Sequence, residues 1–556
     1  MNNPNIRTGA QLLVDTLITN NVEMAFGVPG ESYLAVLDAL YDTKQIEFTI
    51  CRQEGGAAMM ADAYGKLTSR PGICFVTRGP GATNASAGVH IAYQDSSPMI
   101  LFIGQVARSM LDREAFQEID YRQMFGGMSK WTAQINDAER VPEYVSRAFY
   151  LAMSGRPGPV VLAIPEDMLR EVAKPTFLAP AQKIEAHPGK PEIQKFHQLL
   201  SSSKSPLIIL GGTGWSKEAC SNLQIFAENN NIPVTCAFRC QHLFDNEHPL
   251  YAGDIGIGIN PELSKRVKNA DVLIAFGPRL GEITSGGYQL IKPPVISQTL
   301  IHIHSGAEEL GRVYQPALAI NATPTTFSRA LINIKSIKSN QSTSKARTQY
   351  LNWSQPKKTK DNINLGEIIT WLSNNTPSNT IITNGAGNYS AWVHRYYRYR
   401  GLNTGLAPTS GSMGYGTPAA ISAKKLYPER LVIAFAGDGC FLMNGQELAT
   451  AVQYKLPIII IVINNSMYGT IRMHQEREYP ERVFATNLSN PDFVALGRAY
   501  GAFSKLVKRT EEFSVIFQQA IESKRPSLIE IKISPEIITP STTLSNIRKT
   551  ALKRSL

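Results

Sequence analysis

Hydrophobic and polar positions divide the chain into three stretches that alternate short β-branched runs with amphipathic helical patterns. In the first stretch the pattern predicts a helix over 9–20 and strands over 46–51, 73–77, 99–103 and 159–164. In the second, which follows a Pro-rich segment at 174–192, it predicts strands over 206–210, 271–276 and 299–303. In the third, the predicted strands cover 380–383, 431–436, 458–463 and 527–533. This alternation is typical of parallel sheets covered by helices.

The length of 556 residues also favours several domains over a single hydrophobic core. We therefore predict the α/β fold class, with three doubly wound parallel-sheet domains at 1–180, 190–335 and 361–540. A basic linker at 336–360 and a basic C-terminal tail at 541–556 complete the predicted organisation.

The net charge of +11 raises the question of a nucleic-acid partner, and its distribution argues against one. Seven basic residues and no acidic residue lie in 335–360, and four basic residues without an acidic one lie in 541–556. The rest of the chain is therefore balanced, which is not the charge pattern of a groove that binds a polynucleotide. We interpret the two basic segments as a solvated linker and tail.

Other classes of protein are excluded or disfavoured by the same sequence. The longest apolar run, 456–463, is far shorter than the ~20 residues of a membrane-spanning helix. The first five residues lack the features of a signal peptide, so we expect a cytoplasmic protein with no membrane contact. Cys236 and Cys240 have no second pair to complete a zinc site, and His302 and His304 share one face of a predicted strand, where a metal pair is the less favoured alternative.

The clearest chemical signal lies at the ends of two predicted strands in the third stretch. Gly437-Asp438-Gly439 follows one strand, a helix is predicted over 445–454, and Asn465 follows the next strand. Because both strands of a right-handed βαβ unit run the same way, Asp438 and Asn465 are expected at one sheet edge. One carboxylate and one amide oxygen suit Mg²⁺, and the flanking glycines allow a diphosphate to approach the backbone.

This arrangement resembles the diphosphate-binding motif of thiamine-diphosphate enzymes. The resemblance implies that Asp438 and Asn465 ligate Mg²⁺ together with the backbone carbonyl of Met467. It also implies that the three domains are a pyrimidine-binding, a central and a diphosphate-binding domain. The cofactor-binding residues that it implies are Gly411, Met413, Gly437, Asp438, Gly439, Asn465, Met467, Tyr468 and Gly469.

Two further segments fit the same resemblance. Glu54 follows a predicted strand and opens a helix rich in small residues; the family places there the glutamate that protonates N1′ of the cofactor's aminopyrimidine. A buried carboxyl with a raised pKa would suit that role, whereas a favourable interaction with the helix dipole is the alternative. Met413 would be the apolar wedge beneath the cofactor, and the Gly411 carbonyl would accept from the 4′-amino group; for Met413, core filling is the alternative.

Within the family, the chain resembles acetolactate synthases over nearly its whole length. The motifs are Phe26-Gly-Val-Pro-Gly30, Gly79-Pro-Gly-Ala-Thr-Asn84, Ala115-Phe-Gln-Glu118, Ser154-Gly-Arg-Pro-Gly-Pro159 and Gly277-Pro-Arg279. Phe116 and Gln117 stand where pyruvate decarboxylases carry paired histidines. The departures are Glu31 for a loop glycine, Arg78 for Ser, Ile283 for Arg, Thr470 for Met and His474 for Trp.

The middle stretch leaves its ligand open. Arg156, Gly211 and Gly212 match positions that contact a non-catalytic FAD in acetolactate synthases. In contrast, Tyr251-Ala-Gly-Asp-Ile-Gly256 matches the corresponding family segment poorly, and Gly211-Gly-Thr-Gly214 is also explained by a tight strand–helix turn.

We predict a Mg²⁺- and thiamine-diphosphate-dependent enzyme that decarboxylates a 2-oxo acid and joins the product to a second carbonyl. A 2-oxo acid decarboxylase without carboligation, or another C–C lyase, is the alternative, and an inactive cofactor-binding paralogue is a third. The resemblance implies a homodimer or homotetramer with active sites at subunit interfaces and a role in branched-chain amino acid biosynthesis. It leaves a regulatory subunit undetermined.

The predicted catalytic residues are Glu54, Glu31, Phe116, Gln117 and His474. Glu31 is expected to donate a proton after decarboxylation, which would favour aldehyde release over carboligation; a silent pair with Arg78 is the alternative. Phe116 and Gln117 resemble the acceptor-side wall of acetolactate synthases. His474 in place of Trp is expected to weaken the preference for a larger acceptor.

Overall fold

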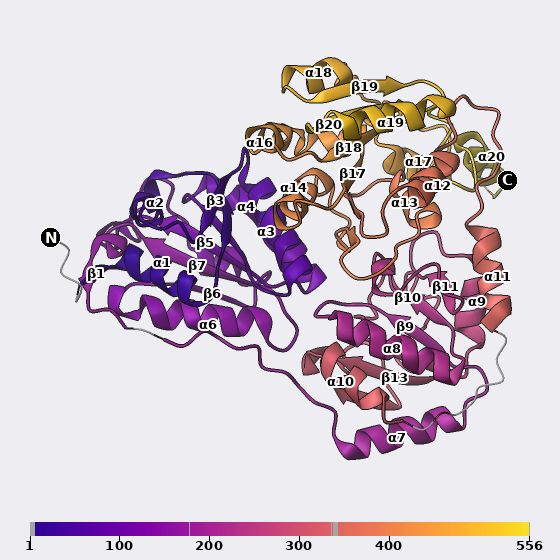
Figure 1. Cartoon of the computed structure of the whole chain (residues 1–556), viewed down its shortest axis with the longest axis horizontal. Helices are drawn as coiled ribbons and strands as arrows, with labels where there is room; N and C mark the ends of the chain where they lie inside the picture. Colours follow the sequence, from indigo (N-terminus) through magenta and orange to yellow (C-terminus); the bar gives the residue numbers. More distant parts are fainter. Residues whose placement is uncertain (1–5, 177, 335, 337–342, 555–556) are drawn as a thin grey trace. The chain divides into compact units, whose positions relative to one another are not determined.

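The chain forms two compact units that meet in the sequence at residues 185 and 186 (Figure 1). The structure is a computed structural model and describes residues 6–176, 178–334, 336 and 343–554. Unit 1 contains one six-stranded sheet and unit 2 contains two, which we call the N-terminal, middle and C-terminal sheets. Neighbouring strands run parallel throughout these three sheets. The predicted α/β class with three parallel-sheet domains is confirmed, whereas the predicted domain boundaries stay a prediction.

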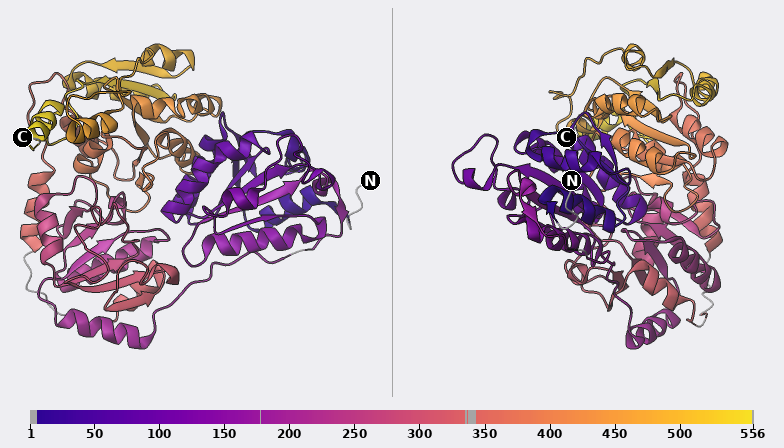
Figure 2. Two further views of the ribbon diagram at one scale, coloured as in Figure 1. Left: turned by 180° about the vertical axis from the view of Figure 1, so that it is seen from behind. Right: turned by 60° about the vertical axis from the view of Figure 1, so that its left-hand side comes forward.

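The N-terminal sheet is covered by helices on both faces (Figures 1 and 2). Its strand order is β3 (Glu47–Ile50), β2 (Met24–Gly27), β4 (Gly72–Val76), β5 (Met99–Gln105), β7 (Pro159–Pro165), β6 (Trp131–Gln134). Unit 1 also contains α1 (Gly9–Thr19), α2 (Leu34–Tyr41), α3 (Glu54–Thr68), α4 (Pro80–Asp95), α5 (Tyr121–Phe125), α6 (Val141–Met153) and the short antiparallel pair β1 (Arg7–Thr8) and β8 (Val172–Ala173). Phe75 and Phe102 belong to a buried cluster with Leu13 of α1 and Phe149 of α6, while α3 and α4 pack together.

The middle sheet has the strand order of Rossmann-type folds, in which two halves progress outward from two central strands. The order is β11 (Tyr251–Asp254), β10 (Val234–Cys236), β9 (Leu207–Leu210), β12 (Val272–Phe276), β13 (Thr299–His304), β14 (Leu318–Asn321). The helices of this part are α7 (Lys190–Ser201), α8 (Lys217–Asn230), α9 (Pro261–Asn269), α10 (Pro324–Leu331) and α11 (Thr343–Trp353).

The C-terminal sheet repeats the strand order of the N-terminal sheet. The order is β16 (Gly405–Leu406), β15 (Ile381–Asn384), β17 (Val432–Gly437), β18 (Ile459–Asn464), β20 (Ser527–Lys532), β19 (Phe503–Val507). Its helices are α12 (Leu365–Asn375), α13 (Ser390–Tyr396), α14 (Gly416–Leu426), α15 (Asp438–Leu442), α16 (Leu448–Gln453), α17 (Gly469–Glu478), α18 (Phe493–Ala499), α19 (Phe513–Glu522) and α20 (Leu544–Arg554). From β15 the next strand in the chain, β16, is added on one side, whereas β17 and β18 are added on the other. Such a reversal of strand order leaves a crevice at the carboxyl edge of a sheet.

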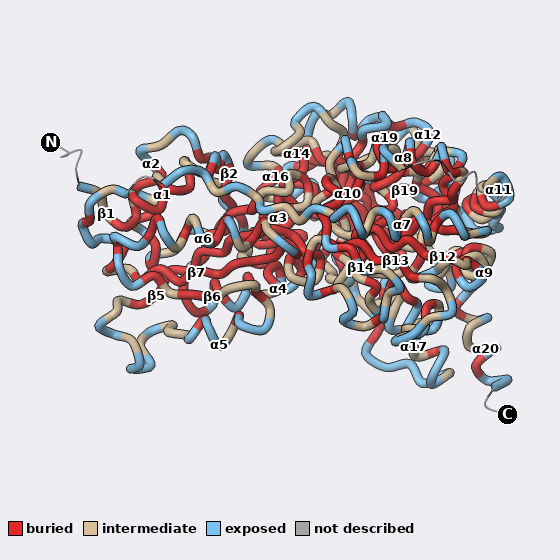
Figure 3. The backbone as a smooth tube through the Cα atoms, turned by 90° about the horizontal axis from the view of Figure 1, so that it is seen from below, coloured by how far each residue is buried: buried red, intermediate tan, exposed pale blue. Residues whose placement is uncertain are grey.

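Burial explains why the central strands were visible in the sequence. Every residue of β5 and β7 is buried, as is every residue of β18, and Figure 3 shows the strands as the buried centre of each unit. Strands covered on both faces are apolar at nearly every position. The predicted strands correspond to observed ones, but the helix predicted over 445–454 is wrong in part. The chain there forms a 3-10 turn at Gly445–Glu447 followed by α16, and α15 begins directly at Asp438.

The two basic segments, interpreted above as a solvated linker and tail, each contain a helix among the described residues. Helix α11 lies within the predicted linker, and its Tyr350 is buried with its ring 4.9 Å from that of Tyr251. Helix α20 lies within the predicted tail and packs on α17. Lys335, the last residue of the predicted middle domain, and Lys338 of the predicted linker lie outside the described residues, as do the N-terminal residues 1–5.

A buried ion pair joins α20 to α17. Arg548 on α20 donates through Nε to Glu476 at 2.8 Å, and Arg472 lies one turn away on α17 at 3.3 Å. Glu476 is fully buried, and the hydrogen bond from Arg548 is the main cause that lowers its pKa from 4.5 to about 2. The C-terminal helix is thus part of the folded unit rather than a solvated tail.

This ion pair makes the stability of unit 2 depend on pH. Because the native pKa of Glu476 is depressed, its contribution is complete above about pH 5 and is lost as the pH falls toward 2. The shift corresponds to about 3 kcal/mol. We expect the difference in unfolding free energy between the parent protein and Glu476→Gln to shrink as urea titrations move from pH 6 to about pH 3. Glu478→Gln, which alters an exposed carboxylate on the same helix, α17, should show no such trend; a constant difference for Glu476→Gln would contradict the assignment.

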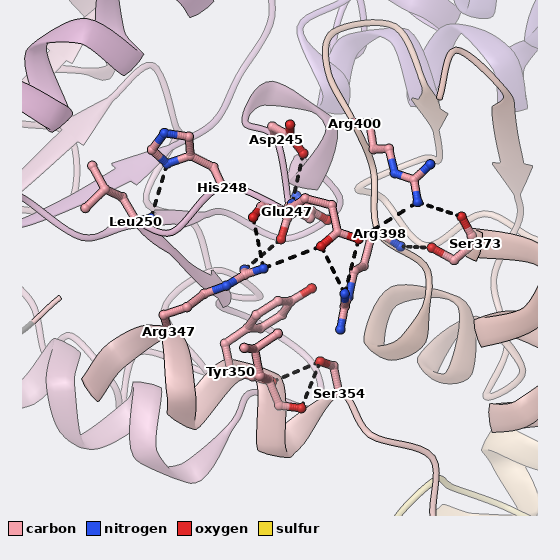
Figure 4. Close-up of polar contacts among 12 residues, drawn as sticks. Asp245, Glu247, His248, Leu250, Arg347, Tyr350, Ser354, Ser373, Arg398 and Arg400 are labelled. Carbon is pink, nitrogen blue, oxygen red and sulfur yellow. Dashed lines mark hydrogen bonds and ion pairs between the residues drawn. The ribbon is translucent and has the colours of Figure 1, made fainter. Parts of the chain in front are cut away.

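A second polar cluster joins the middle and C-terminal parts of unit 2 (Figure 4). Glu247, in the loop before β11, accepts two hydrogen bonds from Arg398 at 3.0 and 3.1 Å. Arg347 on α11 donates to the backbone carbonyls of Asn246 and Glu247, and Arg400 donates to the Ser373 carbonyl on α12. Arg347 and Arg400 also lie 3.6 and 3.9 Å from the Glu247 carboxylate, so one carboxylate pairs with three guanidinium groups, from α11 and from the segment 398–400.

The described residues contain no helix long and apolar enough to cross a membrane. All six cysteines are free thiols. Within the same described part, no group of three or more His, Cys, Asp or Glu side chains is placed to hold a metal ion. His302 and His304 are buried; His302 Nε2 lies 2.9 Å from the Pro278 carbonyl, and burial lowers its pKa to about 4. These histidines therefore have a structural role in the middle sheet.

Candidate active site

A cavity of about 250 Å³ opens at the carboxyl edge of the C-terminal sheet, at the reversal between β15 and β17. It is lined by Ala386, Gly387, Asn388, Tyr389, Trp392, Gly411, Met413, Gly437, Asp438, Gly439, Cys440, Ile463, Asn465, Met467, Tyr468, Gly469, Thr470, Ile471, Ile533 and Ile537. All nine residues predicted to bind the cofactor are among them. The segment 386–392 was missed, although its position after a predicted strand is where α/β folds bind ligands.

Of the described residues that line the cavity, Asp438 alone carries a carboxylate. It follows β17, and the pairing of Gly437 with Ile463 in the sheet brings it level with the end of β18. Its Oδ2 accepts from Asn490 Nδ2 at 2.7 Å. Burial is the main cause that raises the pKa of Asp438, and the hydrogen bond from Asn490 opposes it.

Asn465 and Met467 add two further oxygen donors to the same cavity. Asn465 Oδ1 accepts from the Met467 amide at 3.3 Å, which holds the amide side chain over its own turn. Within the described residues, the Met467 carbonyl oxygen accepts no hydrogen bond. A carboxylate, an amide and a carbonyl oxygen form the hard-oxygen donor set that Mg²⁺ prefers, so the residues present fit this ion.

A hydrogen-bonded network behind Asp438 was not found from the sequence. Glu530 on β20 is buried and accepts from Asn464 Nδ2 at 2.8 Å. Asn464 Oδ1 in turn accepts from Asn490 Nδ2 at 3.0 Å, and the same Nδ2 donates to Asp438. The network orients the Asn490 amide so that its N–H groups face Asp438. Asn490 lies 52 positions after Asp438, and no local signal marks it.

Two of the predicted glycines lie so close to aromatic rings that a larger residue would clash with them. A Cβ at Gly439 would lie 2.6 Å from the Tyr468 ring, and one at Gly437 would lie 3.1 Å from the Tyr389 ring. Gly411 has φ +70, a left-handed conformation that glycine adopts readily. Gly411 and Met413 both line the cavity, which is the location expected of the carbonyl acceptor and the apolar wedge.

Glu54 lies in unit 1 at the first position of α3. Gln53 caps this helix by accepting from the Gly56 amide at 2.9 Å, and Asn84 Nδ2 donates to Glu54 Oε2 at 2.9 Å. Glu54 is only partly buried within unit 1, so the buried carboxyl expected from the sequence is not a property of the single chain. Its placement after β3 at the start of a helix agrees with the sequence-based prediction.

Arg78 contacts two of the other predicted residues of unit 1, Glu31 and Phe116. Its guanidinium donates to Glu31 Oε1 at 3.1 Å, to Glu166 Oε2 at 3.2 Å and to the Phe116 carbonyl at 3.2 Å. The pair of Glu31 with Arg78, given above as the alternative, is therefore present. The Glu31 side chain is 70% exposed and the Phe116 side chain is exposed as well.

Thr470 and His474, two positions that depart from the family pattern, lie on α17. Thr470 lines the cavity and donates through its hydroxyl to Asn388 Oδ1 at 2.9 Å. His474 lies one turn further along the helix and is exposed. The structure thus brings Thr470 to the cavity, whereas His474 is not among the residues that line it.

Comparisons with known proteins agree with this geometry. Three models of thiamine pyrophosphate enzymes match the chain: the N-terminal TPP-binding domain at 7–124, the central domain at 193–331 and the C-terminal TPP-binding domain at 385–531. The C-terminal match contains most of the segments that line the cavity. Together with the relatives below, these matches show that the chain belongs to the thiamine pyrophosphate enzymes.

The relatives narrow this class. A probable acetolactate synthase large subunit of Methanocaldococcus jannaschii is 32% identical, over 97% of this chain and 95% of the relative. An acetolactate synthase large subunit of Corynebacterium glutamicum is 31% identical over 96% and 88%, and the isozyme 2 large subunit of Escherichia coli is 29% identical over 94% and 95%. This chain is an acetolactate synthase-like enzyme.

The residues matched to a flavin site have other contacts. Arg156 in unit 1 is buried and donates to the Ser96 hydroxyl at 2.9 Å and to the Tyr93 carbonyl. The Gly211 carbonyl accepts from the Trp215 indole at 2.9 Å, and a Cβ at Gly212 would lie 2.1 Å from the Gly277 carbonyl oxygen. The close packing of these loops is sufficient to explain the glycines.

Proposed function

We propose that this enzyme uses Mg²⁺ and thiamine diphosphate to decarboxylate a 2-oxo acid and to join the decarboxylated fragment to a second carbonyl. The observation that carries the proposal is the cavity in unit 2, where Asp438, Asn465 and Met467 supply oxygen donors beside Gly411 and Met413. The names of the relatives support the carboligating outcome over decarboxylation alone.

Different residues of the chain would hold the metal ion, the diphosphate and the rings of the cofactor. Asp438, Asn465 and the Met467 carbonyl would hold Mg²⁺, and the amides at the start of α17 would face the diphosphate. Met413 would support the cofactor from the apolar side, and the Gly411 carbonyl would accept a hydrogen bond from its amino group. Bound between these residues, the cofactor would supply a nucleophilic carbon and a group able to hold the electron pair left by CO₂.

Glu54 would exchange a proton with N1′ of the aminopyrimidine, which a carboxyl held by one amide hydrogen bond from Asn84 can do. In this family the cofactor is shared between subunits, so we infer a homodimer or a dimer of dimers. The partial burial of Glu54 and the exposure of Phe116 in the single chain support that inference.

A product analysis tests the proposal. The enzyme is incubated with Mg²⁺, thiamine diphosphate and a panel of 2-oxo acids, and CO₂, aldehyde and condensation product are quantified. We expect CO₂ release that requires both Mg²⁺ and the cofactor, with a condensation product as the main organic product. Aldehyde alone would indicate a decarboxylase, and no turnover with any 2-oxo acid despite cofactor binding would overturn the proposal.

Asn490 offers a test of the network behind Asp438. We expect Asn490→Ala to weaken Mg²⁺-dependent cofactor binding by about 10–100-fold, because a metal ligand loses the partner that orients it. Fluorescence of Trp392, which lines the cavity, reports binding during Mg²⁺ titration at fixed cofactor. Asn375→Ala, which removes an exposed bond to the Trp371 carbonyl, is the matched control. Equal affinities in the two variants would show that Asn490 does not orient Asp438.

The role of Glu31 in product partition also stays a prediction. Arg78 engages Oε1 of Glu31, whereas Oε2 has no hydrogen bond among the described residues, so one oxygen remains available to a ligand. We expect Glu31→Gly to raise the ratio of condensation product to aldehyde with pyruvate as donor. Glu166→Gln removes the other carboxylate from Arg78 and serves as the control. A ratio that is unchanged in Glu31→Gly, at unchanged cofactor affinity, would exclude this role.

A further inference from the structure

Arg239 is a buried arginine of the middle part whose side chain extends to the C-terminal part. It follows β10 in the chain, is 7% exposed and has φ +62. A left-handed backbone is uncommon for any residue other than glycine, and it persists where the surroundings determine the conformation strongly. The contacts of the guanidinium group show what those surroundings are.

The guanidinium donates to one backbone carbonyl in each of two loops. Nη2 donates to the Gly385 carbonyl at 2.9 Å, and Nη1 donates to the Pro408 carbonyl. Gly385 follows β15 and directly precedes the cavity-lining residues 386–389; Pro408 begins the segment that carries Gly411 and Met413. The two loops follow β15 and β16, which are neighbouring strands at one edge of the C-terminal sheet.

Both carbonyls also take part in the local geometry of their loops. The Pro408 carbonyl accepts from the Gly411 amide at 3.0 Å, which closes the turn that presents Gly411 to the cavity. The Gly385 carbonyl accepts from Asn384 Nδ2 at 2.8 Å, and the Gly385 amide donates to the Tyr389 hydroxyl at 3.0 Å. Arg239 is therefore the donor that joins two turns, each of which already has its own hydrogen bonds.

We propose that Arg239 is a positioning residue for the cofactor cavity. It would hold the 385–389 and 408–413 loops at a fixed separation, so that Gly411 and Met413 stay where the cofactor needs them. A planar guanidinium presents two N–H groups in a rigid fork, whereas a lysine ammonium is a point charge on a flexible stem. The part of the proposal that concerns the cofactor rests on the proposed function; the part that concerns the loops does not.

The first test needs no cofactor. Hydrogen–deuterium exchange is measured on the cofactor-free protein for Arg239→Met, which keeps much of the side-chain volume without the donors. We expect faster exchange in peptides that cover 385–389 and 408–414, including the Gly411 amide. Arg398→Met is the matched control, because Arg398 joins the same two parts of unit 2 through Glu247 but lies outside the residues that line the cavity (Figure 4). Its exchange in these peptides should equal that of the parent protein.

The second test measures thiamine diphosphate affinity at saturating Mg²⁺ through Trp392 fluorescence. We expect a loss of about tenfold or more for Arg239→Met, as for the removal of hydrogen bonds to a charged donor, and less than threefold for Arg398→Met. Arg239→Lys should fall between the parent and Arg239→Met in both measurements, and it carries the test if Arg239→Met does not fold. A parent protein that binds no cofactor would refute the proposed function and leave the exchange result to decide the loop contact.

Two outcomes would overturn the inference. Unchanged exchange at 385–389 and 408–414 in both Arg239 variants would show that Arg239 does not hold the loops. Faster exchange with unchanged cofactor affinity would show that the contact is structural only. Urea unfolding of the same variants separates these results from a general loss of stability, which would affect Arg398→Met as well.

Discussion

Asp438→Ala is expected to abolish Mg²⁺-dependent retention of thiamine diphosphate and, with it, all turnover. Among the described residues that line the cavity, only Asp438 carries a carboxylate, so its loss removes the negative charge that balances a divalent cation beside a diphosphate. We expect the cofactor affinity to fall by roughly a thousandfold, which corresponds to about 4 kcal/mol. Titration calorimetry with the cofactor at fixed Mg²⁺ measures this loss directly.

Two further variants sharpen this experiment. Asp438→Asn keeps the shape and one oxygen donor but removes the charge, so its affinity should lie between those of the parent and Asp438→Ala. Asp361→Ala removes an exposed carboxylate that accepts only from the nearby Thr359 and should bind the cofactor normally. Cofactor affinity of Asp438→Ala within a few-fold of the parent would show that the metal does not bind at this carboxylate.

Glu54→Gln is expected to behave in the opposite way: it keeps the cofactor but loses its activation. Glutamine preserves the size of the side chain and an oxygen that can accept from Asn84, but it has no carboxyl proton to exchange with the aminopyrimidine. We expect turnover to fall by about 10²–10⁴-fold, the range typical of a lost acid–base group. Proton–deuterium exchange at C2 of the bound cofactor, followed by NMR, should slow in parallel.

The comparison between the two variants is the decisive measurement. Cofactor affinity should stay within a few-fold of the parent in Glu54→Gln and be lost in Asp438→Ala. Glu23→Gln, an exposed carboxylate of the same unit, is the control for loss of charge. If Glu54→Gln and Asp438→Ala lost cofactor binding to the same extent, the division between an activating and an anchoring carboxylate would be wrong.

The approximate positions of many strands and the predicted cofactor-binding residues were predictable because local sequence carries the signals for them. β18 is apolar from Ile459 to Ile463 since helices cover both faces of its sheet, and this run stands out without any tertiary information. Asp438 and Asn465 follow directly after such strands, and parallel strands end at one edge. The cavity therefore contains the residues that the motif predicted.

The errors have a common physical cause. Helices α11 and α20 lie in basic, polar segments whose composition resembles that of a linker. They are folded because a few residues make specific contacts, such as Tyr350 with Tyr251 and Arg548 with Glu476. Composition averages over a segment, whereas docking depends on single side chains that meet a partner elsewhere in the chain.

The amino-acid sequence by itself determined the fold class, the strand–loop positions that carry the cofactor motif and the family to which the chain is similar, since each depends on neighbouring residues. Only the tertiary structure decided which polar groups meet: Asn490 with Asp438, Arg78 with Glu31, and Arg239 with the loops at Gly385 and Pro408. Polar side chains have several possible hydrogen-bond partners of equal chemistry. Which partner each side chain meets depends on the segments that the packed sheets bring together, so it cannot be predicted from a local sequence pattern.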